Sequence, residues 1–517
     1  MSAPDREQFI EAAIKEIRDL EVHGAWTGVP LSEANGEEIV LTTWVFTRKR
    51  TPDGRIKKWK ARLCLRGDLM RGVNNAFAPV VAFSTVRVFL VISIIAGWKT
   101  CSIDFSNAFI QAKRTQPIFV HVPKGFCTIK ENHVLKLVRS LYGARDAPKL
   151  WLELLFKAFK EYGLTQSMLD PCLWLGKNLF LICFVDEVGI CYKSDESLNS
   201  FYLFFEEKKF DFTKETTFED YLGIQYVPME NGSIYLLQTG LIKKILNLTN
   251  LTNSRPNRQP AQKDPLGIDP DGQKFSENWD YASIVGMLLY LSNNTRPDIT
   301  FAVSQVARFT HQPKQSHGIA VKTILRYLRG TLDKGTIVHR TTSLSLTCFS
   351  DADFAGLFRR DPNEAPTSAK SRSGFLISLS GSPVVWKSQL QSTIALSTAE
   401  SEYYSLSIAM RTLLPIRQLI QEIVTTVSIP NHLQLTSANL RATVYEDNTS
   451  ALTLATEQQI TSRTRHYHVR CHHFWQAVRE GKIVVEYVET SHQDAEYLTK
   501  CNAWVTFSSN RFRVQGW

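Results

Sequence analysis

The sequence lacks the cysteine pattern of a disulfide-bonded protein. Its nine cysteines are an odd number, lie scattered between Cys64 and Cys501, and include no CxxC pair. Thiols in this arrangement are typical of reduced cysteines in an intracellular protein, which excludes a small secreted disulfide scaffold. We therefore expect a chain that works inside the cell, in the cytoplasm or the nucleus.

Long hydrophobic runs are also missing. The N-terminus, MSAPDREQFIEAAIKEI, is polar and acidic, unlike a signal peptide. The longest apolar run, Val88–Ala96, contains Ser93 and is too short to cross a bilayer. We expect no membrane partner.

Low-complexity tracts and internal repeats are absent too, and the composition is that of a globular protein, with 44% hydrophobic and 21% charged residues. A length of 517 residues predicts about three domains. The formal net charge is +10, of which residues 336–517 carry only +2 and the first 335 residues +8. This excess of positive charge favours a polyanionic partner bound by the N-terminal part.

Hydrophobic periodicity divides the chain into segments. Residues 9–20 have helical spacing, with apolar residues at Phe9, Ala13, Ile14, Ile17 and Leu20. WVFTRKR and IKKWKARLCLR, joined by TPDG, predict a basic hairpin, and residues 86–97 predict a buried helix. The polar stretch 253–277 is the best linker candidate. A new α/β pattern begins near residue 344, and its helix AESEYYSLSIAMRTLL is expected to end before Pro415.

Three carboxylates interrupt apolar strand patterns in the first half. Asp104 lies in CSIDFSNAF, and Asp186 with Glu187 lies at the centre of LICFVDEVGICY. Taken singly, each could be a solvated and inert residue at a strand edge. An acidic pair at a hairpin tip with a third carboxylate nearby is more suggestive, because such a trio can hold two Mg²⁺ ions for an in-line phosphoryl transfer.

The C-terminal segment repeats this logic with four carboxylates. They are Asp351 in CFSDADFAG, Glu402 in STAESEYYSL, Asp447 after ATVYE and Glu496 in TSHQDAEYLTK. Glu402 could instead be a first-turn helix residue and Asp447 a turn former. Together, four carboxylates on an α/β unit could hold two metal ions for phosphodiester hydrolysis.

A series of motifs accompanies FVDE along the chain: WVFTRKRTPDGRIKKWKARL, FAPVVAFSTVRVFLVISIIAGW, SIDFSNAFIQA, VHVPKGF, SLYGARDAPKLW, DPCLW, YLGIQY, YASIVGMLLYLSNNTRPDITFAVSQVARF, SDADFAG, SRSGF, VVWKSQLQSTIALSTAESEY, EDNTSAL and AEYLTK. FVDE in its apolar hairpin resembles the YVDD box of reverse transcriptases. The order of the whole series resembles that of copia-type LTR retrotransposon Pol proteins.

The resemblance implies a fold and an activity. The fold would be an α+β right-hand polymerase with fingers, palm and thumb, followed by an α/β RNase H-like domain. Residues 1–25 would be a helical lead-in, 26–252 the reverse transcriptase fingers and palm, 253–335 a linker and thumb or connection, and 336–517 the RNase H-like domain. The activity would be RNA-directed DNA synthesis with degradation of the RNA in the hybrid, in the cytoplasm (in a virus-like particle) or the nucleus.

The resemblance also implies partners and cofactors. An RNA template, a DNA primer, the RNA–DNA hybrid and dNTPs would be the partners, and each active site would hold two Mg²⁺ or Mn²⁺ ions. The oligomeric state stays open.

Roles in the polymerase site follow from the same resemblance. Asp104 and Asp186 would be the main metal ligands, assisted by Glu187. Five residues would bind the nucleotide. The ring of Phe109 would exclude the 2′-hydroxyl, and the cations Lys60 and Arg62 would contact the triphosphate. Tyr142 and Gly143 would shape the nucleotide pocket. For Phe109, the alternative is simple packing in the core. For Lys60 and Arg62, it is a solvated basic strand face, and Gly143 could be only a turn residue.

In the C-terminal part, the positions that match the family's metal ligands are Asp351, Glu402, Asp447 and Glu496. Glu400 competes with Glu402, which fits the family's helix pattern better. The histidine-rich segment SRTRHYHVRCHHFW does not have zinc-ligand spacing and is expected to flank the hybrid.

Two positions depart from the family pattern, because Glu187 and Glu496 stand where it has Asp. A longer side chain moves the carboxylate by about one bond length, and a misplacement of about 1 Å can cost about 100-fold in rate. The alternative function is therefore a catalytically weakened or inactive nucleic-acid-binding relic. No protease or integrase motif precedes the first motif, so we expect the tail of a polyprotein or a truncated element.

Overall fold

The computed structural model describes residues 5–50, 56–71, 76–123, 132–215, 217–264, 266–341, 343–358, 366–429, 440–458 and 472–517. The chain divides into two compact units. Unit 1 comprises Met1–Val81 and Lys99–Thr217, and unit 2 comprises Ala82–Trp98 and Phe218–Trp517. Among the described helices, none combines the length and apolarity that a membrane span requires.

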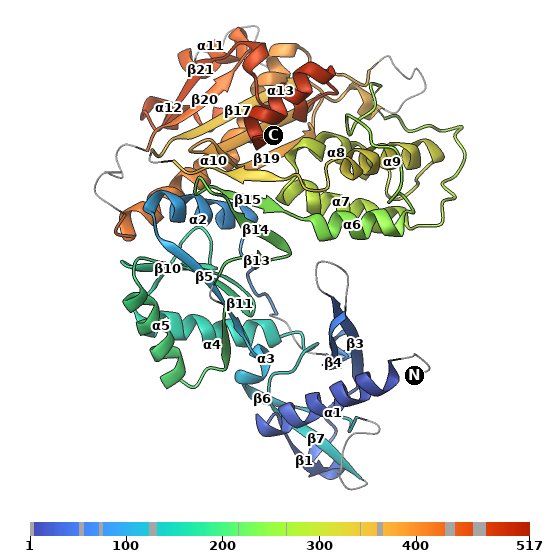
Figure 1. Ribbon diagram of the computed structural model, residues 1–517, viewed down its shortest axis with the longest axis vertical. Coiled ribbons are helices and arrows are strands. Elements are labelled where there is room, and N and C mark those ends of the chain that lie inside the picture. Colours follow the sequence, from blue (N-terminus) through green and yellow to red (C-terminus); the bar gives the residue numbers. More distant parts are fainter. Residues whose placement is uncertain are drawn as a thin grey trace. The chain divides into compact units, whose positions relative to one another are not determined.

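Unit 1 contains four α-helices and twelve strands in its described residues (Figure 1). In chain order they are α1 (Arg6–Val22), β1 (Trp26–Pro30), β2 (Ile39–Val40), β3 (Thr42–Arg50), β4 (Ile56–Leu65), β5 (Lys99–Phe105), α3 (Ala108–Gln111), β6 (Lys113–Val120), β7 (His133–Arg139), α4 (Ala147–Tyr162), β8 (Thr165–Gln166), β9 (Leu173–Leu175), β10 (Leu179–Phe184), β11 (Glu187–Tyr192), α5 (Asp195–Glu207), β12 (Phe212–Glu215), and the short 3₁₀ turns Leu31–Ala34 and Gly67–Leu69.

A six-stranded antiparallel sheet forms the centre of unit 1. Its order is β12-β5-β11-β10-β9-β8. Helices α4 and α5 pack their apolar sides on it, and buried rings such as Trp151, Phe159 and Phe205 fill the space between helices and sheet. The apolar runs that predicted two core strands around FVDE are confirmed as β10 and β11.

The basic hairpin predicted from the sequence is also present. Strands β3 and β4 pair antiparallel, from Thr42 opposite Leu65 to Arg50 opposite Ile56. The predicted turn TPDG lies outside the described residues. Helix α1 packs on β4, but its buried face includes Glu16, whereas Ile14 is 47% exposed. The helix predicted from the spacing of residues 9–20 is present, although Ile14 does not belong to its buried face.

Unit 2 joins one early helix to the remainder of the chain. Its elements are α2 (Phe83–Ala96), β13 (Asp220–Tyr221), β14 (Ile224–Pro228), β15 (Ile234–Leu237), α6 (Thr239–Leu248), α7 (Tyr281–Asn294), α8 (Thr300–Ala307), α9 (Gln315–Arg329), β16 (Thr336–Val338), β17 (Leu346–Asp353), β18 (Arg372–Leu379), β19 (Ser382–Leu390), α10 (Thr398–Thr426), β20 (Ala442–Glu446), α11 (Thr449–Glu457), α12 (Trp475–Arg479), β21 (Ile483–Tyr487), α13 (Trp504–Gln515), and the 3₁₀ turns Pro297–Ile299, Pro366–Ala369, Thr490–His492 and Glu496–Leu498.

The predicted buried helix is α2, and it packs in unit 2. Arg87 on α2 is 5% exposed and donates to the backbone oxygens of Val384, Asn293 and Asn294. Its guanidinium carbon lies 4.1 Å from the centre of the Trp386 ring. These contacts anchor the helix next to strand β19.

The polar stretch 253–277 also belongs to unit 2. Ala261, Leu266 and Phe275 pack against the unit's apolar core, so a few apolar side chains hold a segment that the composition indicates to be a linker. The functional domain boundaries inferred from the sequence stay a prediction.

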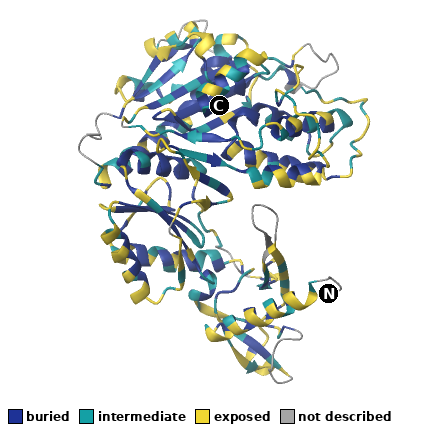
Figure 2. Cartoon of the chain, viewed as in Figure 1, coloured by how far each residue is buried: buried dark blue, intermediate teal, exposed yellow. Residues whose placement is uncertain are grey.

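The C-terminal sheet has five strands in the order β19-β18-β17-β20-β21. The first three are antiparallel neighbours, and β17, β20 and β21 run parallel. Helix α10 packs against β17 and β18, and all eight residues of β18 are buried. Figure 2 shows that the interior of this sheet is mostly buried. The predicted fold class, a mixed polymerase fold followed by an α/β domain, is confirmed.

Helix α10 is longer than predicted. It continues through Pro415 to Thr426, because the residues after the proline, including Ile416, Leu419 and Ile423, are buried. Proline removes one intrahelical hydrogen bond, and this apolar burial offsets the loss.

Candidate functional sites

The first candidate site lies at the tip of the β10–β11 hairpin in unit 1. Phe184 pairs with Glu187, so Val185 and Asp186 form a two-residue turn. Val185 has a φ of +57°, which a β-branched residue rarely adopts and which costs about 1–3 kcal/mol. The indole nitrogen of the buried Trp151 donates to the Val185 oxygen at 2.7 Å, and the Phe105 amide donates to the Asp186 oxygen at 2.8 Å. These bonds hold the strained turn that presents Asp186.

The strand register places two further carboxylates beside this turn. Glu187 on β11 lies directly opposite Asp104 on β5. Opposed residues of antiparallel strands have Cβ atoms about 5 Å apart, and like charges there repel each other. A divalent cation that takes oxygen ligands would offset this repulsion, so Asp104, Asp186 and Glu187 suit a hard metal ion. Across the described residues, however, these three do not gather their oxygens within 4.8 Å of one another.

An aromatic and cationic surface adjoins the same carboxylates. The rings of Phe109 and Tyr142 lie 4.7 Å apart, and the guanidinium carbon of Arg62 lies 4.4 Å from the Tyr142 ring centre. Burial raises the pKa of Tyr142 to about 12; Arg62 opposes this rise, whereas Asp186 and Asp104 add to it. The structure thus brings Arg62, Phe109 and Tyr142 together with the candidate metal ligands.

Gly143 fixes how closely this surface approaches the basic hairpin formed by β3 and β4. Its φ is +85°, and a Cβ atom there would lie 2.2 Å from the backbone oxygen of Leu65. The Leu65 amide donates to the Tyr142 oxygen at 2.7 Å. Only glycine fits this position, so Gly143 is required by the packing as well as by the turn.

The sequence reasoning missed Glu16 on α1. Its carboxylate is 9% exposed and accepts from the Leu63 amide at 3.3 Å. Burial raises the pKa of Glu16, and the positive charges of Lys60 and Arg62 oppose this effect. Glu16 is therefore an acidic neighbour of both Lys60 and Arg62. The sequence did contain a signal for it, because Glu16 is an acidic residue among the core positions of the helix.

The second candidate site lies in the C-terminal sheet of unit 2. Asp351, Glu402 and Asp447 have carboxylate oxygens within 4.8 Å of one another, and they form the only such acidic trio found in the described residues. The parallel register explains this, because Phe349 pairs with Tyr445 and each aspartate follows two positions later. Asp351 and Glu402 are 3% and 8% exposed.

Without a bound cation, the ionised form of the buried carboxylates in this trio is unfavourable. Burial raises the pKa of Asp351 to about 6, against the attraction of Lys500 and a hydrogen bond donated by the Thr499 hydroxyl. The pKa of Glu402 is also raised, first by burial and then by Glu446, and its Oε2 has no hydrogen-bond partner. Three oxygen donors with an unsatisfied buried oxygen fit a divalent cation such as Mg²⁺.

Glu400 and Glu496 occupy different places. Glu400 accepts from the Leu396 amide at 2.7 Å at the start of α10, outside the trio. Glu496, expected as the fourth ligand, binds Lys500 at 3.0 Å and accepts from Asn502 at 3.2 Å. Its charge still raises the pKa of Asp351. The structure does not bring Glu496 into the trio.

Sequence reasoning also missed Glu446, which is fully buried and has an Oε2 atom without a partner. The alternation of β20 places Ala442, Val444 and Glu446 on the buried face, so a carboxyl stands where the pattern favours an apolar residue. Of the histidine-rich segment, residues 462–471 lie outside the described residues.

Comparison with known proteins defines the class first. Residues 25–263 match the family described as reverse transcriptase (RNA-dependent DNA polymerase). This segment contains both the β10–β11 hairpin with Asp186 and the basic β3–β4 hairpin with Arg62.

Whole-chain relatives are Pol polyproteins of plant transposons. The chain is 30% identical over 470 residues to the Pol polyprotein from transposon RE1 of Arabidopsis thaliana, covering 89% of this chain and 31% of the relative. It is 29% identical to that from transposon TNT 1-94 of Nicotiana tabacum, covering 97% and 37%. The chain thus spans about a third of the length of these relatives. The resemblance inferred from the motifs is confirmed, because the chain is similar over most of its length to Pol polyproteins of copia-type transposons.

A solved structure is also similar. The foamy viral protease-reverse transcriptase in complex with RNA/DNA hybrid aligns with a TM-score of 0.43 and 14% identity, covering 92% of this chain and 52% of that chain.

Proposed function

We propose that the chain is an RNA-directed DNA polymerase that extends a DNA primer on an RNA template. The observation that carries the proposal is the placement of Asp104, Asp186 and Glu187 at one end of the sheet, near Tyr142 with its neighbours Arg62 and Phe109. All of them lie in the segment that matches the reverse transcriptase family. The net charge of +8 in the first 335 residues supports a nucleic-acid partner.

Each group would have a separate task. Asp104, Asp186 and Glu187 would hold two Mg²⁺ or Mn²⁺ ions, which when bound stabilise the charge on the transferring phosphoryl group. Lys60 and Arg62 would attract the dNTP triphosphate, as cations suited to that charge. The Phe109 ring, supported by Tyr142, would lie under the incoming sugar and disfavour a 2′-hydroxyl.

A second activity, ribonuclease H cleavage of the RNA–DNA hybrid, is proposed for the trio in unit 2. Asp351, Glu402 and Asp447 would hold the metal ions, and Thr490 orients Asp447 through a hydrogen bond of 2.8 Å to its carboxylate. Because Glu496 is tied to Lys500 and Asn502, we expect a nuclease with a weakened fourth ligand.

A weakened or inactive nucleic-acid-binding relic is the second candidate. The longer side chain at Glu187, in direct register with Asp104, favours it. In that case the basic surface would keep binding the hybrid while the chemistry is lost.

Primer extension separates the two candidates. Purified chain receives an RNA template, a DNA primer, dNTPs and Mg²⁺ or Mn²⁺, with Asp186→Asn as the matched control. If the chain is a polymerase, the wild type should extend the primer and Asp186→Asn should not. The wild type should also prefer dNTPs to rNTPs, and Phe109→Ala should reduce this preference. Salt-sensitive hybrid binding without any extension would establish the relic instead.

A further inference from the structure

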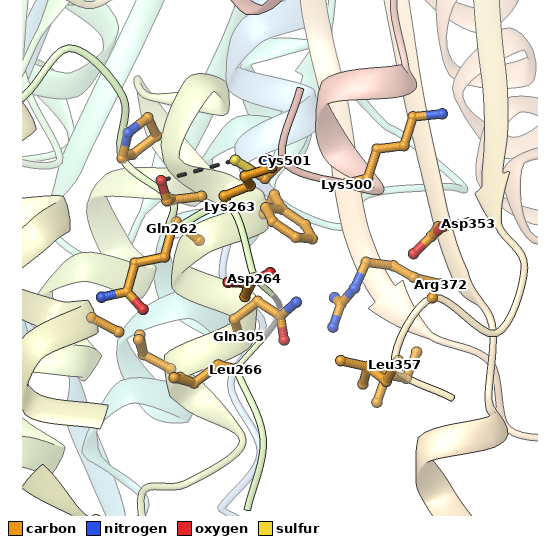
Figure 3. A pocket seen from close by; sticks show the side chains of 18 of the residues that line it. Gln262, Lys263, Asp264, Leu266, Gln305, Asp353, Leu357, Arg372, Lys500 and Cys501 are labelled. Atoms are coloured by element: carbon orange, nitrogen blue, oxygen red, sulfur yellow. Dashed lines mark hydrogen bonds between the residues drawn. The ribbon is translucent and has the colours of Figure 1, made fainter. Parts of the chain in front are cut away.

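A cavity of about 210 Å³ lies within unit 2, and its lining contains none of the three carboxylates of the acidic trio. Helices α8 and α9 and strands β17, β18 and β19 contribute its walls (Figure 3). Its lining includes apolar side chains, among them Phe301, Val306, Leu357 and Leu390. A cavity of this kind can enclose a small molecule rather than a polymer.

Arg372 is the most unusual group in this cavity. Its residue is 4% exposed, and Nη1 donates to the hydroxyls of Ser304 at 2.7 Å and Ser388 at 3.2 Å. Nη2 is buried without any hydrogen-bond partner. The guanidinium points into the cavity toward Gln305 (Figure 3).

Among the described residues, Arg372 donates no hydrogen bond to a carboxylate, and its two side-chain partners are neutral serine hydroxyls. The charge of Asp353, its register partner on β17, favours the cationic form of Arg372. Burial lowers the pKa of Arg372 to about 9, so the group is still cationic at pH 7. Burying a cation whose N–H donor has no partner destabilises the folded chain, unless a bound anion accepts that hydrogen bond and balances the charge.

Other charged groups make the cavity cationic. Lys263, Lys370 and Lys500 join Arg372 in the lining, against the two carboxylates of Asp264 and Asp353. Lys500 is already engaged with Glu496, whereas Lys263 and Lys370 come from two separate segments of the lining. A dianionic group suits several cations, and the planar guanidinium fork matches phosphate geometry.

We propose that this cavity binds a phosphate group, with Arg372 as its central donor. Two sources share this chemistry: free inorganic phosphate, and a nucleoside monophosphate whose base would rest on Phe301 and the apolar wall. None of the carboxylates proposed as metal ligands lines this cavity, and Lys500 is the lining residue that links it to Asp351 and Glu496.

Calorimetric titration of the full chain tests the proposal. Adenosine 5′-monophosphate, inorganic phosphate and adenosine are titrated separately in EDTA at constant chloride concentration. We expect binding of adenosine 5′-monophosphate and at least about tenfold weaker binding of adenosine, because a charge-assisted hydrogen bond is lost. Tighter binding of the nucleotide than of inorganic phosphate assigns the mononucleotide as ligand, and equal binding assigns free phosphate.

Variants locate the binding in this cavity. The double variant Lys263→Gln, Lys370→Gln should weaken phosphate binding about tenfold, whereas Lys244→Gln, an exposed lysine on α6, should leave it unchanged. Arg372→Gln should abolish it, with the fold checked by circular dichroism. Absence of binding to the wild-type chain, equal affinity for adenosine, or unchanged affinity in the double lysine variant would overturn the proposal.

Discussion

Replacing Asp351 by Asn should stabilise the metal-free protein while removing nuclease activity. The carboxylate is 3% exposed, lies in the acidic trio, and has its pKa raised from 3.8 to about 6, mainly by burial. Asparagine has nearly the same shape, and its amide oxygen can still accept the hydrogen bond from Thr499.

The size and the pH range of this effect follow from the raised pKa. Each pH unit is worth about 1.4 kcal/mol, so the displacement from 3.8 to about 6 corresponds to about 3 kcal/mol. Between these values the unfolded chain ionises while folded Asp351 keeps its proton, so folding stability falls as pH rises. Below pH 4 the difference between wild type and Asp351→Asn should vanish, and above pH 6 it should be complete.

Urea unfolding in EDTA at pH 4, 6 and 8 measures this difference. At pH 8 the free energy of unfolding should be higher for Asp351→Asn by up to about 3 kcal/mol, whereas Asp271→Asn, at an exposed carboxylate, should change it little. Added Mg²⁺ should stabilise the wild type more than the variant, because the ion binds only the folded site. A variant that is less stable at pH 8, or equally affected at all three pH values, would refute the reasoning.

Three further outcomes are expected. Glu187→Asp shortens the arm opposite Asp104 and should raise primer extension by up to about 100-fold, so a lower rate would contradict the geometric explanation. Gly143→Ala should lower thermal stability more than Gly36→Ala, because both have φ above +80° but only the first Cβ would strike backbone; equal losses would show that the contact is unimportant. Asp298→Asn breaks a fully buried ion pair and should cost about 3–5 kcal/mol in urea unfolding, against less than about 1 kcal/mol for the exposed Asp333→Asn.

Much of the architecture could be predicted because it depends on apolar periodicity. The runs on either side of Asp186 became β10 and β11, and the strand around Asp351 became β17. Parallel pairing of β17 with β20, which gathers Asp351 and Asp447, is a long-range contact that no local pattern contains.

The unpredicted residues share one physical property, which is a buried charge. Glu16, Arg372 and Glu446 stand at positions where burial favours apolar side chains, so their environment depends on neighbours distant in sequence. Glu496 lies outside the trio for a different reason, because its carboxylate interacts with Lys500 and Asn502, which are near it in sequence.

We propose that one chain carries two separate acidic sites for two reactions on the same nucleic acid. A crossed assay tests this most directly: primer extension and cleavage of labelled RNA in a hybrid are both measured for Asp186→Asn and for Asp447→Asn. Loss of extension alone in the first variant and loss of cleavage alone in the second is the predicted result. Loss of both activities in either correctly folded variant, or of neither, would contradict the account.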